Sequence, residues 1–356
     1  MVKAPLIAEM LGEFRRYHRG YGEIILQGNY DDESLHMLDY AITELGVESV
    51  ELKFAQGSKG IQGMGRVEDL DKAQREHDKG YLVYPNPRDE VIEENYKKGL
   101  GQVFEKIGKL PMWNEEILIN RVRELRELGA KRVCFKVGPF DPEDLLRILK
   151  IASKAGVDLV TFDGAGGGSG NSPTKMMNEW GMPTVNMESS LYKILAAMDK
   201  KGYKLPQVAI AGGFVMEDQV YKGLALGAPY VDMIGIGRGA MSAAMSSKVV
   251  EDLIRNGKTP KVYERFGDSV EEIFSGYREL GLIYGEETKE ISAGAVGVYS
   301  YLSRVATGLK QFMALNRKFK LCYISREGIV PLTSLAAQVS GLETFSDKTR
   351  RAIENL

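Results

Sequence analysis

The chain has 356 residues, of which 44% are hydrophobic and 27% are charged, and its formal net charge of −2 gives no indication of a general nucleic-acid or membrane-surface binder. It contains no apolar run of 18 residues and no signal-peptide core, so we expect a cytoplasmic protein with no membrane partner. Two cysteines and three histidines without metal-binding spacing cannot supply a disulfide framework, an intrinsic iron–sulfur cluster or a metal site.

Apolar strands and amphipathic helices alternate through the first 245 residues. Each strand-like run is short, and most are followed by a helical pattern, as between Met216 and Leu226. Because right-handed crossovers connect such units, the strands are expected to be parallel. The six expected runs are Glu23–Gly28, Ser49–Gln56, Arg132–Gly138, Leu159–Asp163, Val208–Ala211 and Asp232–Ile236.

This alternation predicts an α/β fold, a TIM-type (β/α)8 barrel of which about six strands are recognisable in this chain. The barrel is expected over residues 1–245, interrupted at 66–112 by a polar stretch that we interpret as a long-loop excursion. Residues 246–356 are expected to form a C-terminal helical region packed on the barrel. Within that region, Phe319–Ile324 suits either a strand or a buried linker.

Two consecutive strands end in glycine-rich loops. Gly212 and Gly213 follow the first strand, and Gly235, Gly237 and Arg238 lie at the end of the second. The last two strands of a (β/α)8 barrel end in loops whose backbone N–H groups bind phosphate, and glycine lets the backbone approach the phosphate oxygens. Arginine adds a forked donor. We interpret the pair as a phosphate site; the alternative is two tight turns with no ligand.

Charged and polar side chains interrupt three of the apolar strands. Lys53 and Gln56 share one strand, Lys136 lies within the next, and Asp163 ends a third. Side chains alternate between the two faces of a strand, so in the strand of Lys136 the residues Val133, Phe135 and Val137 lie on one face and the lysine lies on the other. A buried lysine requires an anionic partner. That partner is either a carboxylate, in a structural ion pair with Asp163 or Glu51, or an anionic ligand.

An anionic ligand that fits these features is flavin mononucleotide, FMN. The phosphate site would hold one end of it, and the glycine-rich ends of three strands would leave room for a planar ring. A lysine near the ring would stabilise the negative charge of its reduced form.

Two longer segments resemble a known family. Gln56-Gly57-Ser58-Lys59-Gly60, with Met64-Gly65, resembles the AQGAKPGxGG segment of the FMN-binding synthase domain of glutamate synthase. The segment Asp163–Pro173 resembles that family's GHDGGTGASP segment. The similarity covers roughly residues 20–245.

The resemblance implies a TIM barrel that binds FMN noncovalently and reduces an imine or a keto or amino acid, as in the conversion of 2-oxoglutarate and ammonia to glutamate. It implies that Lys136, Lys59 and Gln56 are catalytic, Lys59 by holding the 2-oxoglutarate carboxylate. The cofactor-binding residues that it implies are Lys53, Gln56, Lys136, Asp163, Gly166, Gly167, Gly212, Gly213, Gly235, Gly237 and Arg238.

The sequence departs from the family in three respects. The cysteines of the family's 3Fe–4S cluster are absent from Met241–Ser247, the N-terminal cysteine of glutaminase chemistry is absent, and the first two barrel strands have no counterpart before Gly22. The chain is therefore a fragment, or a partner supplies the strands, or the barrel is built differently. An electron-donor or glutaminase subunit and a homo-oligomer are left open as partners. The alternative functions are a non-redox FMN or phosphate-binding barrel, isomerase-like, and a non-catalytic subunit of an electron-transfer complex.

Overall fold

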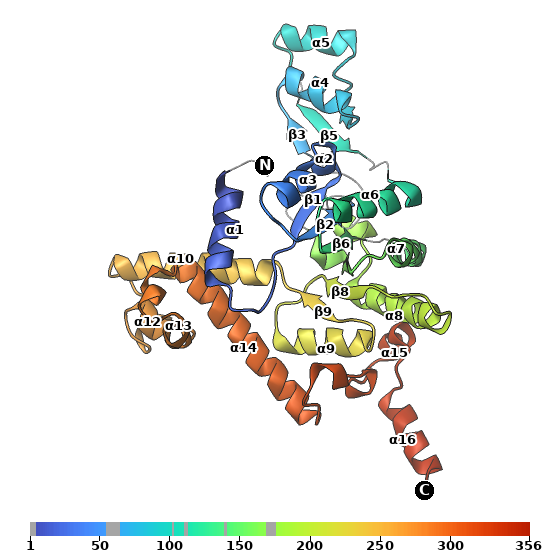
Figure 1. Cartoon of the computed structure of the whole chain (residues 1–356), viewed down its shortest axis with the longest axis vertical. Coiled ribbons are helices and arrows are strands. Elements are labelled where there is room, and N and C mark those ends of the chain that lie inside the picture. The colour runs from blue at the N-terminus through green and yellow to red at the C-terminus, as the bar shows by residue number, and fades with distance from the viewer. Residues whose placement is uncertain (1–4, 55–64, 102, 110–112, 139–140, 169–175) are drawn as a thin grey trace. The chain divides into compact units, whose positions relative to one another are not determined.

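The chain forms two compact units, which are described separately. The first comprises Met1–Gly212 and Tyr230–Met233, and the second comprises Gly213–Pro229 and Ile234–Leu356. The computed structural model (Figure 1) describes residues 5–54, 65–101, 103–109, 113–138, 141–168 and 176–356.

A six-stranded sheet organises the βα part of the chain. Its order is β1-β2-β6-β7-β8-β9, and the pairs from β1 to β8 are parallel. The expected α/β class, with about six strands, is confirmed by this arrangement. The strands are β1 (Leu26–Asn29), β2 (Ser49–Lys53), β6 (Arg132–Val137), β7 (Leu159–Asp163), β8 (Gln207–Ala211) and β9 (Met233–Gly235).

Helices connect these strands, and polar residues define where they begin. The Asp141 side chain caps the helix that opens with Pro142, whose fixed φ suits the first turn, and Gly156 ends this helix in the left-handed conformation. The segment after β1 forms two short helices, which are separated at His36, a residue with a φ of 53°. The helices are α1 (Pro5–Tyr17), α2 (Tyr30–Ser34), α3 (Met37–Thr43), α6 (Glu115–Glu127), α7 (Pro142–Ala155), α8 (Thr184–Lys200) and α9 (Glu217–Gly227).

An aspartate fixes the start of two strand pairs. Asp158 precedes β7, and its Oδ2 accepts a hydrogen bond from Val133 N on β6 at 2.8 Å. Asp232 precedes β9, and its Oδ2 accepts one from Val208 N on β8 at 2.9 Å. Each aspartate also donates its backbone N–H to the carbonyl of the same partner. These paired bonds set the register that determines which side chains face one another further along the strands.

The two faces of the sheet differ in polarity, as the alternation in β6 predicts. Phe135 and Phe162 lie on one face and are fully buried. Glu51, Thr161 and Asp163 alternate with apolar neighbours and lie on the other face. The sheet therefore has an apolar face for packing and a face that carries charge.

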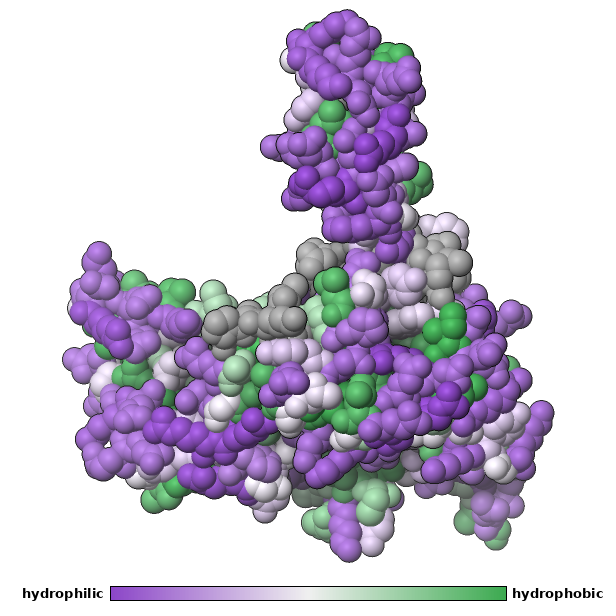
Figure 2. Space-filling view, turned by 45° about the horizontal axis from the view of Figure 1, so that its top comes forward, coloured by the Kyte–Doolittle hydropathy of each residue, from purple (hydrophilic) through white to green (hydrophobic). Residues whose placement is uncertain are grey.

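The excursion at 66–112 contains a small fold of its own within the described residues, so the interpretation as a long loop was wrong. An antiparallel sheet, in the order β3-β5-β4, packs with two helices around Tyr81, Phe104 and four smaller residues. These core residues are separated by charged residues in the sequence, so the helices and strands of the excursion were not recognised. The surface of the excursion is largely hydrophilic (Figure 2). Its elements are β3 (Gly65–Val67), α4 (Leu70–Asp78), β4 (Leu82–Tyr84), α5 (Glu90–Lys97) and β5 (Phe104–Gly108).

The second unit is mainly helical. Helices α10 and α14 pack closely through small residues. Gly297 on α14 is so near Ser247 on α10 that an added Cβ would overlap the serine side chain. Phe319–Ile324 is not a strand: it contains a 3-10 turn at Leu321–Tyr323, and Phe319 is exposed. The helices after β9 are α10 (Arg238–Arg255), α11 (Lys261–Glu264), α12 (Val270–Ile273), α13 (Tyr277–Tyr284), α14 (Ala293–Leu315), α15 (Ser334–Ser340) and α16 (Phe345–Glu354). None of the helices in the described ranges has the length and apolar character needed to cross a bilayer.

The buried face of the sheet yields a stability prediction. Phe162 is fully buried, so Phe162→Ala removes its contacts and leaves a cavity that should lower the free energy of unfolding by about 3–5 kcal/mol. Urea unfolding followed by circular dichroism measures this, with Tyr21→Ala as control because Tyr21 is 90% exposed. Equal unfolding midpoints for the two variants would contradict the assignment of Phe162 to the core.

Candidate functional site

The polar face of the sheet carries a connected group of side chains in the first unit. The carboxylate of Glu51, on β2, is buried and accepts hydrogen bonds from Gln27 Nε2 at 2.5 Å and from Thr161 Oγ1 at 3.3 Å. These three residues come from β1, β2 and β7. The sequence singled out Glu51 only as an ion-pair partner and did not identify Gln27 or Thr161, because their role depends on the strand register.

Two lysines lie next to each other further along the same face. Lys53 and Lys136 are register partners on β2 and β6. Lys136 Nζ lies 3.4 Å from Asp163 Oδ2, which is the ion pair that the sequence offered as one alternative. Burial, and then the charge of Lys136, lower the pKa of Lys53. Adjacent ammonium groups on a partly buried face favour an additional negative charge there.

Asp163 has one carboxylate oxygen that is not satisfied. Its side chain is 7% exposed, and within the described residues its Oδ1 is buried and accepts no hydrogen bond. Burial raises the pKa of Asp163, and the Lys136 ammonium offsets part of this rise. A buried polar atom without a partner is costly, so the site has capacity for one more hydrogen bond.

The loop after β7 brings glycine backbone against this carboxylate. A Cβ added at Gly167 would lie 3.0 Å from Asp163 Oδ1, and one at Gly164 would lie 2.3 Å from Thr184 Oγ1. Gly164 N also donates to Ala211 O at 2.8 Å, which ties the loop to β8. These glycines are required for close approach of the backbone. Gly166, the other predicted ring-binding glycine, is exposed.

The two glycines after β8 have different surroundings. Gly212 has a φ of +134°, and a Cβ there would lie 2.5 Å from Thr184 Oγ1, which donates to Gly212 O at 2.8 Å. Packing in the first unit therefore explains Gly212 without a ligand. Gly213 has a φ of +88° and is exposed, with no atom near the position of an added Cβ. No local pattern in the sequence indicates the role of Thr184, which lies 28 residues before Gly212.

In the second unit, the loop after Gly213 meets the start of α10. Tyr301, on α14, donates from its hydroxyl to Val215 O at 2.5 Å, and a Cβ at Gly239 would lie 2.8 Å from that hydroxyl. Gly237 is the N-cap of α10, and its surroundings are open. Arg238 is the first residue of the helix and is exposed. An 18-residue helix that begins after a glycine with open surroundings can bind an anion through the N–H groups of its first turn.

The remaining predicted positions add little. Gly235 is the last residue of β9 and is partly buried. Gln56 and Lys59 lie outside the described residues, so their roles stay predictions. Among the described residues, no group of three His, Cys, Asp or Glu side chains is placed to hold a metal ion.

The buried carboxyl group gives a pH-dependent stability prediction. Because the pKa of Asp163 is raised in the folded state above its ordinary value of 3.8, the folded protein takes up this proton first as the pH falls. The stability of the wild type relative to Asp163→Asn should therefore increase as the pH falls through the folded pKa, and the gain should be complete below 3.8. Unfolding free energies of both proteins across this pH range measure the effect. A difference that does not change with pH would contradict the raised pKa.

Part of the chain is similar to glutamate synthase. Residues 110–250 match the model of the family described as the conserved region in glutamate synthase. The chain is 27% identical over 130 residues to the glutamate synthase large subunit-like protein YerD of Bacillus subtilis strain 168. That alignment covers 36% of this chain and 24% of the relative, so the chain spans about a quarter of the relative's length.

Several solved structures are similar at low identity. A mutant flavocytochrome b2 with sulfite bound is 14% identical, with 88% of this chain and 58% of that chain covered and a TM-score of 0.44. A lactate oxidase from Pediococcus acidilactici is 14% identical, with 90% and 62% covered and a TM-score of 0.44. The resemblance to glutamate synthase that the segment Asp163–Pro173 predicts is thus confirmed by the family match over residues 110–250.

Proposed function

We propose that this chain is an FMN-dependent oxidoreductase of the glutamate synthase type. The observation that carries the proposal is the pair of register-matched lysines, Lys53 and Lys136, on the polar face of the sheet beside the unsatisfied carboxylate oxygen of Asp163. Two adjacent ammonium groups on a partly buried face are costly unless anions compensate their charge. The family match over residues 110–250, which includes Lys136 and Asp163, supports the same function.

The residues of the first unit fit one end of such a cofactor. Lys53 and Lys136 would face the pyrimidine edge of the ring, where an ammonium group favours the reduced form. Asp163 would hold Lys136 in place, and its free oxygen could accept a hydrogen bond from a ring N–H. Gly164 and Gly167 keep side chains out of this space. When bound, FMN supplies the capacity to accept and donate a hydride.

The residues of the second unit fit a phosphate. No atom lies within 4 Å of the position of an added Cβ at Gly213 or Gly237, and α10 begins at Arg238. Gly237 and Arg238 are therefore proposed to bind the phosphate group, together with Gly213 and Gly235. Gly212 is proposed to act by holding Thr184 and Gly164 in place, since its own surroundings are filled.

The proposed reaction is the reduction of an imine formed from 2-oxoglutarate, or a related keto acid, and ammonia. The similarity to a glutamate synthase large subunit-like protein supports this substrate class. Lys59 is proposed to bind the substrate carboxylate, with Gln56 beside it. An electron-donor subunit is proposed as a partner, because the two cysteines of the chain cannot hold a cluster that would relay electrons.

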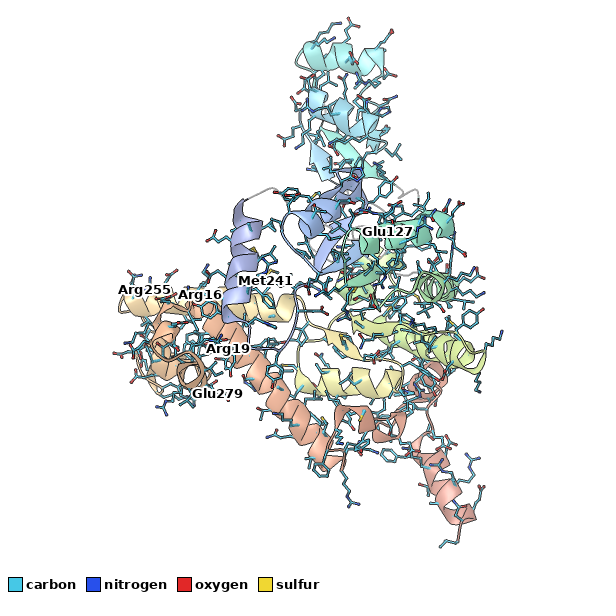
Figure 3. The ribbon with its side chains drawn as sticks, viewed as in Figure 1. Arg16, Arg19, Glu127, Met241, Arg255 and Glu279 are labelled. Atoms are coloured by element: carbon cyan, nitrogen blue, oxygen red, sulfur yellow. The ribbon has the colours of Figure 1, made fainter. Side chains whose placement is uncertain are left out.

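FMN titration of the purified protein tests the proposal. Gly237→Glu introduces a side chain and a like charge and should abolish binding, and Arg238→Ala should weaken it about ten- to a hundredfold, by the loss of a charge-assisted contact of about 1.5–3 kcal/mol. Arg255→Ala is the matched control, because Arg255 lies at the other end of α10 (Figure 3) and is exposed. Quenching of flavin fluorescence gives the dissociation constants. If FMN does not bind the wild type, or binds all three variants equally, the proposed site is wrong.

Lys136 should also tune the cofactor. Lys136→Met keeps the volume and removes the charge, so the reduced, anionic flavin loses more stabilisation than the oxidised flavin. The reduction potential should fall, by roughly 30 mV for each 1.4 kcal/mol lost in a two-electron couple. Titration against a reference dye measures it, with the exposed Lys131→Met as control. Equal potentials in wild type and Lys136→Met would leave Lys136 as a structural partner of Asp163 only.

A further inference from the structure

The first unit contains a cavity that is lined by residues other than those of the polar face of the sheet. It has a volume of about 430 Å³, in the range of small-molecule sites. Its walls come from α2, from the start of α3 and from α6 with the residue Trp113 just before it. The side chains used below are Tyr30, Glu33, Trp113, Ile117, Asn120 and Arg121.

Negative charge exceeds positive charge beside this cavity. The Arg121 guanidinium lies 2.6 Å from Glu33, 2.7 Å from Asp39 and 3.3 Å from Glu124. One guanidinium therefore serves three carboxylates, which leaves two negative charges in excess. His36, 3.3 Å from Asp39, can offset one of them when it is protonated. Glu33 is only 8% exposed, so water screens its charge poorly, whereas Glu124 is 54% exposed and its charge is screened.

Glu33 has a carboxylate oxygen with no partner. Arg121 Nε donates to its Oε2, whereas its Oε1 is buried and, within the described part of the chain, accepts no hydrogen bond. Burial raises the pKa of Glu33, although Arg121 opposes this rise. A buried carboxylate oxygen without a donor is costly, and a ligand N–H in the adjoining cavity would satisfy it.

Other residues of the lining are aromatic and apolar. Tyr30 and Trp113 meet edge to face with ring centroids 5.4 Å apart, and Trp113 also contacts Phe54. Aromatic faces beside carboxylates favour an organic cation, because the ring attracts the charge and the apolar wall covers the carbon chain. Ile117 extends this wall. An anion would meet the excess of carboxylates, and a neutral apolar molecule would leave Glu33 unsatisfied.

We propose that this cavity is a binding site for a small organic cation, a primary ammonium or guanidinium compound with a short carbon chain, held by Glu33 and covered by Tyr30 and Trp113. The site is separate from the lysine-bearing face of the sheet and requires neither FMN nor redox chemistry. Its ligand carries the opposite charge to the one proposed for Lys53 and Lys136.

Isothermal titration with 1,4-diaminobutane at low salt tests the site, with 1,4-butanediol as the neutral control of the same length. The diamine should bind with a dissociation constant of about 1 mM or tighter, and the diol should not bind measurably. Fluorescence is a second readout, because the chain has only two tryptophans and Trp113 lines the cavity. No heat with the diamine, or equal binding of diamine and diol, would overturn the proposal.

Two variants locate the binding. Glu33→Gln keeps the size of the side chain and removes its charge, so diamine affinity should fall about tenfold or more. Glu127→Gln is the control, because Glu127, the last residue of α6 (Figure 3), is 69% exposed and is not among the residues that line the cavity. Equal affinities in these two variants would overturn the assignment.

Asn120→Lys decides the matter if Glu33→Gln fails to fold. Asn120 lines the cavity, so a lysine there would supply the ammonium group from the chain itself. Diamine binding should then be lost, while the melting temperature should stay at or above that of the wild type because the excess negative charge is neutralised. Diamine affinity equal to that of the wild type in Asn120→Lys would show that the ligand binds elsewhere.

Discussion

The ion pair between Lys136 and Asp163 is the interaction on which the polar face of the sheet depends. Asp163 is almost fully buried, and burial of a lone carboxylate there would be costly without the ammonium group 3.4 Å away. Lys53 lies beside Lys136 in register, and Glu51, fixed by Gln27 and Thr161, is the second carboxylate on this face. Two lysines and two carboxylates thus hold a charge-balanced face that a shift of one residue in strand register would destroy.

Local patterns in the sequence predicted the sheet well and the excursion poorly. The β6 run Val133–Val137 alternates in polarity, and its orientation follows from its own residues. In the excursion, the six buried core residues are spread from Val67 to Phe104 and come together only through antiparallel pairing. Each helix and strand of the excursion is short and contributes at most two of these residues, so the single elements give weak signals. The left-handed backbone of His36, which separates α2 from α3, also has no local signal in the sequence.

The site shows the same limit in its glycines. Gly212 and Gly213 are adjacent glycines with different surroundings. Gly212 packs against Thr184, whereas no atom lies near the position of an added Cβ at Gly213. The difference depends on partners far away along the chain, as does the contact of Tyr301 with Val215, 86 residues earlier. Sequence therefore identified the loop but could not separate glycines needed for packing from glycines available to a ligand. The charged residues of the site were easier to identify from the sequence, because a lysine within an apolar strand is unusual in itself.

The charge balance of the polar face also constrains what can bind there. Because Asp163 and Glu51 offset the charges of Lys53 and Lys136, the attraction of this face for an anion increases when one carboxylate takes up a proton. Asp163 is the group suited to this change, because burial already disfavours its ionised form and its Oδ1 has no donor to stabilise it. Negative charge that approaches Lys53 and Lys136 raises the pKa of Asp163 further, and proton uptake then leaves the two lysines in excess. We therefore expect an anionic ligand on this face to favour proton uptake at Asp163, because the ligand would then replace the Asp163 carboxylate as the negative charge beside Lys136.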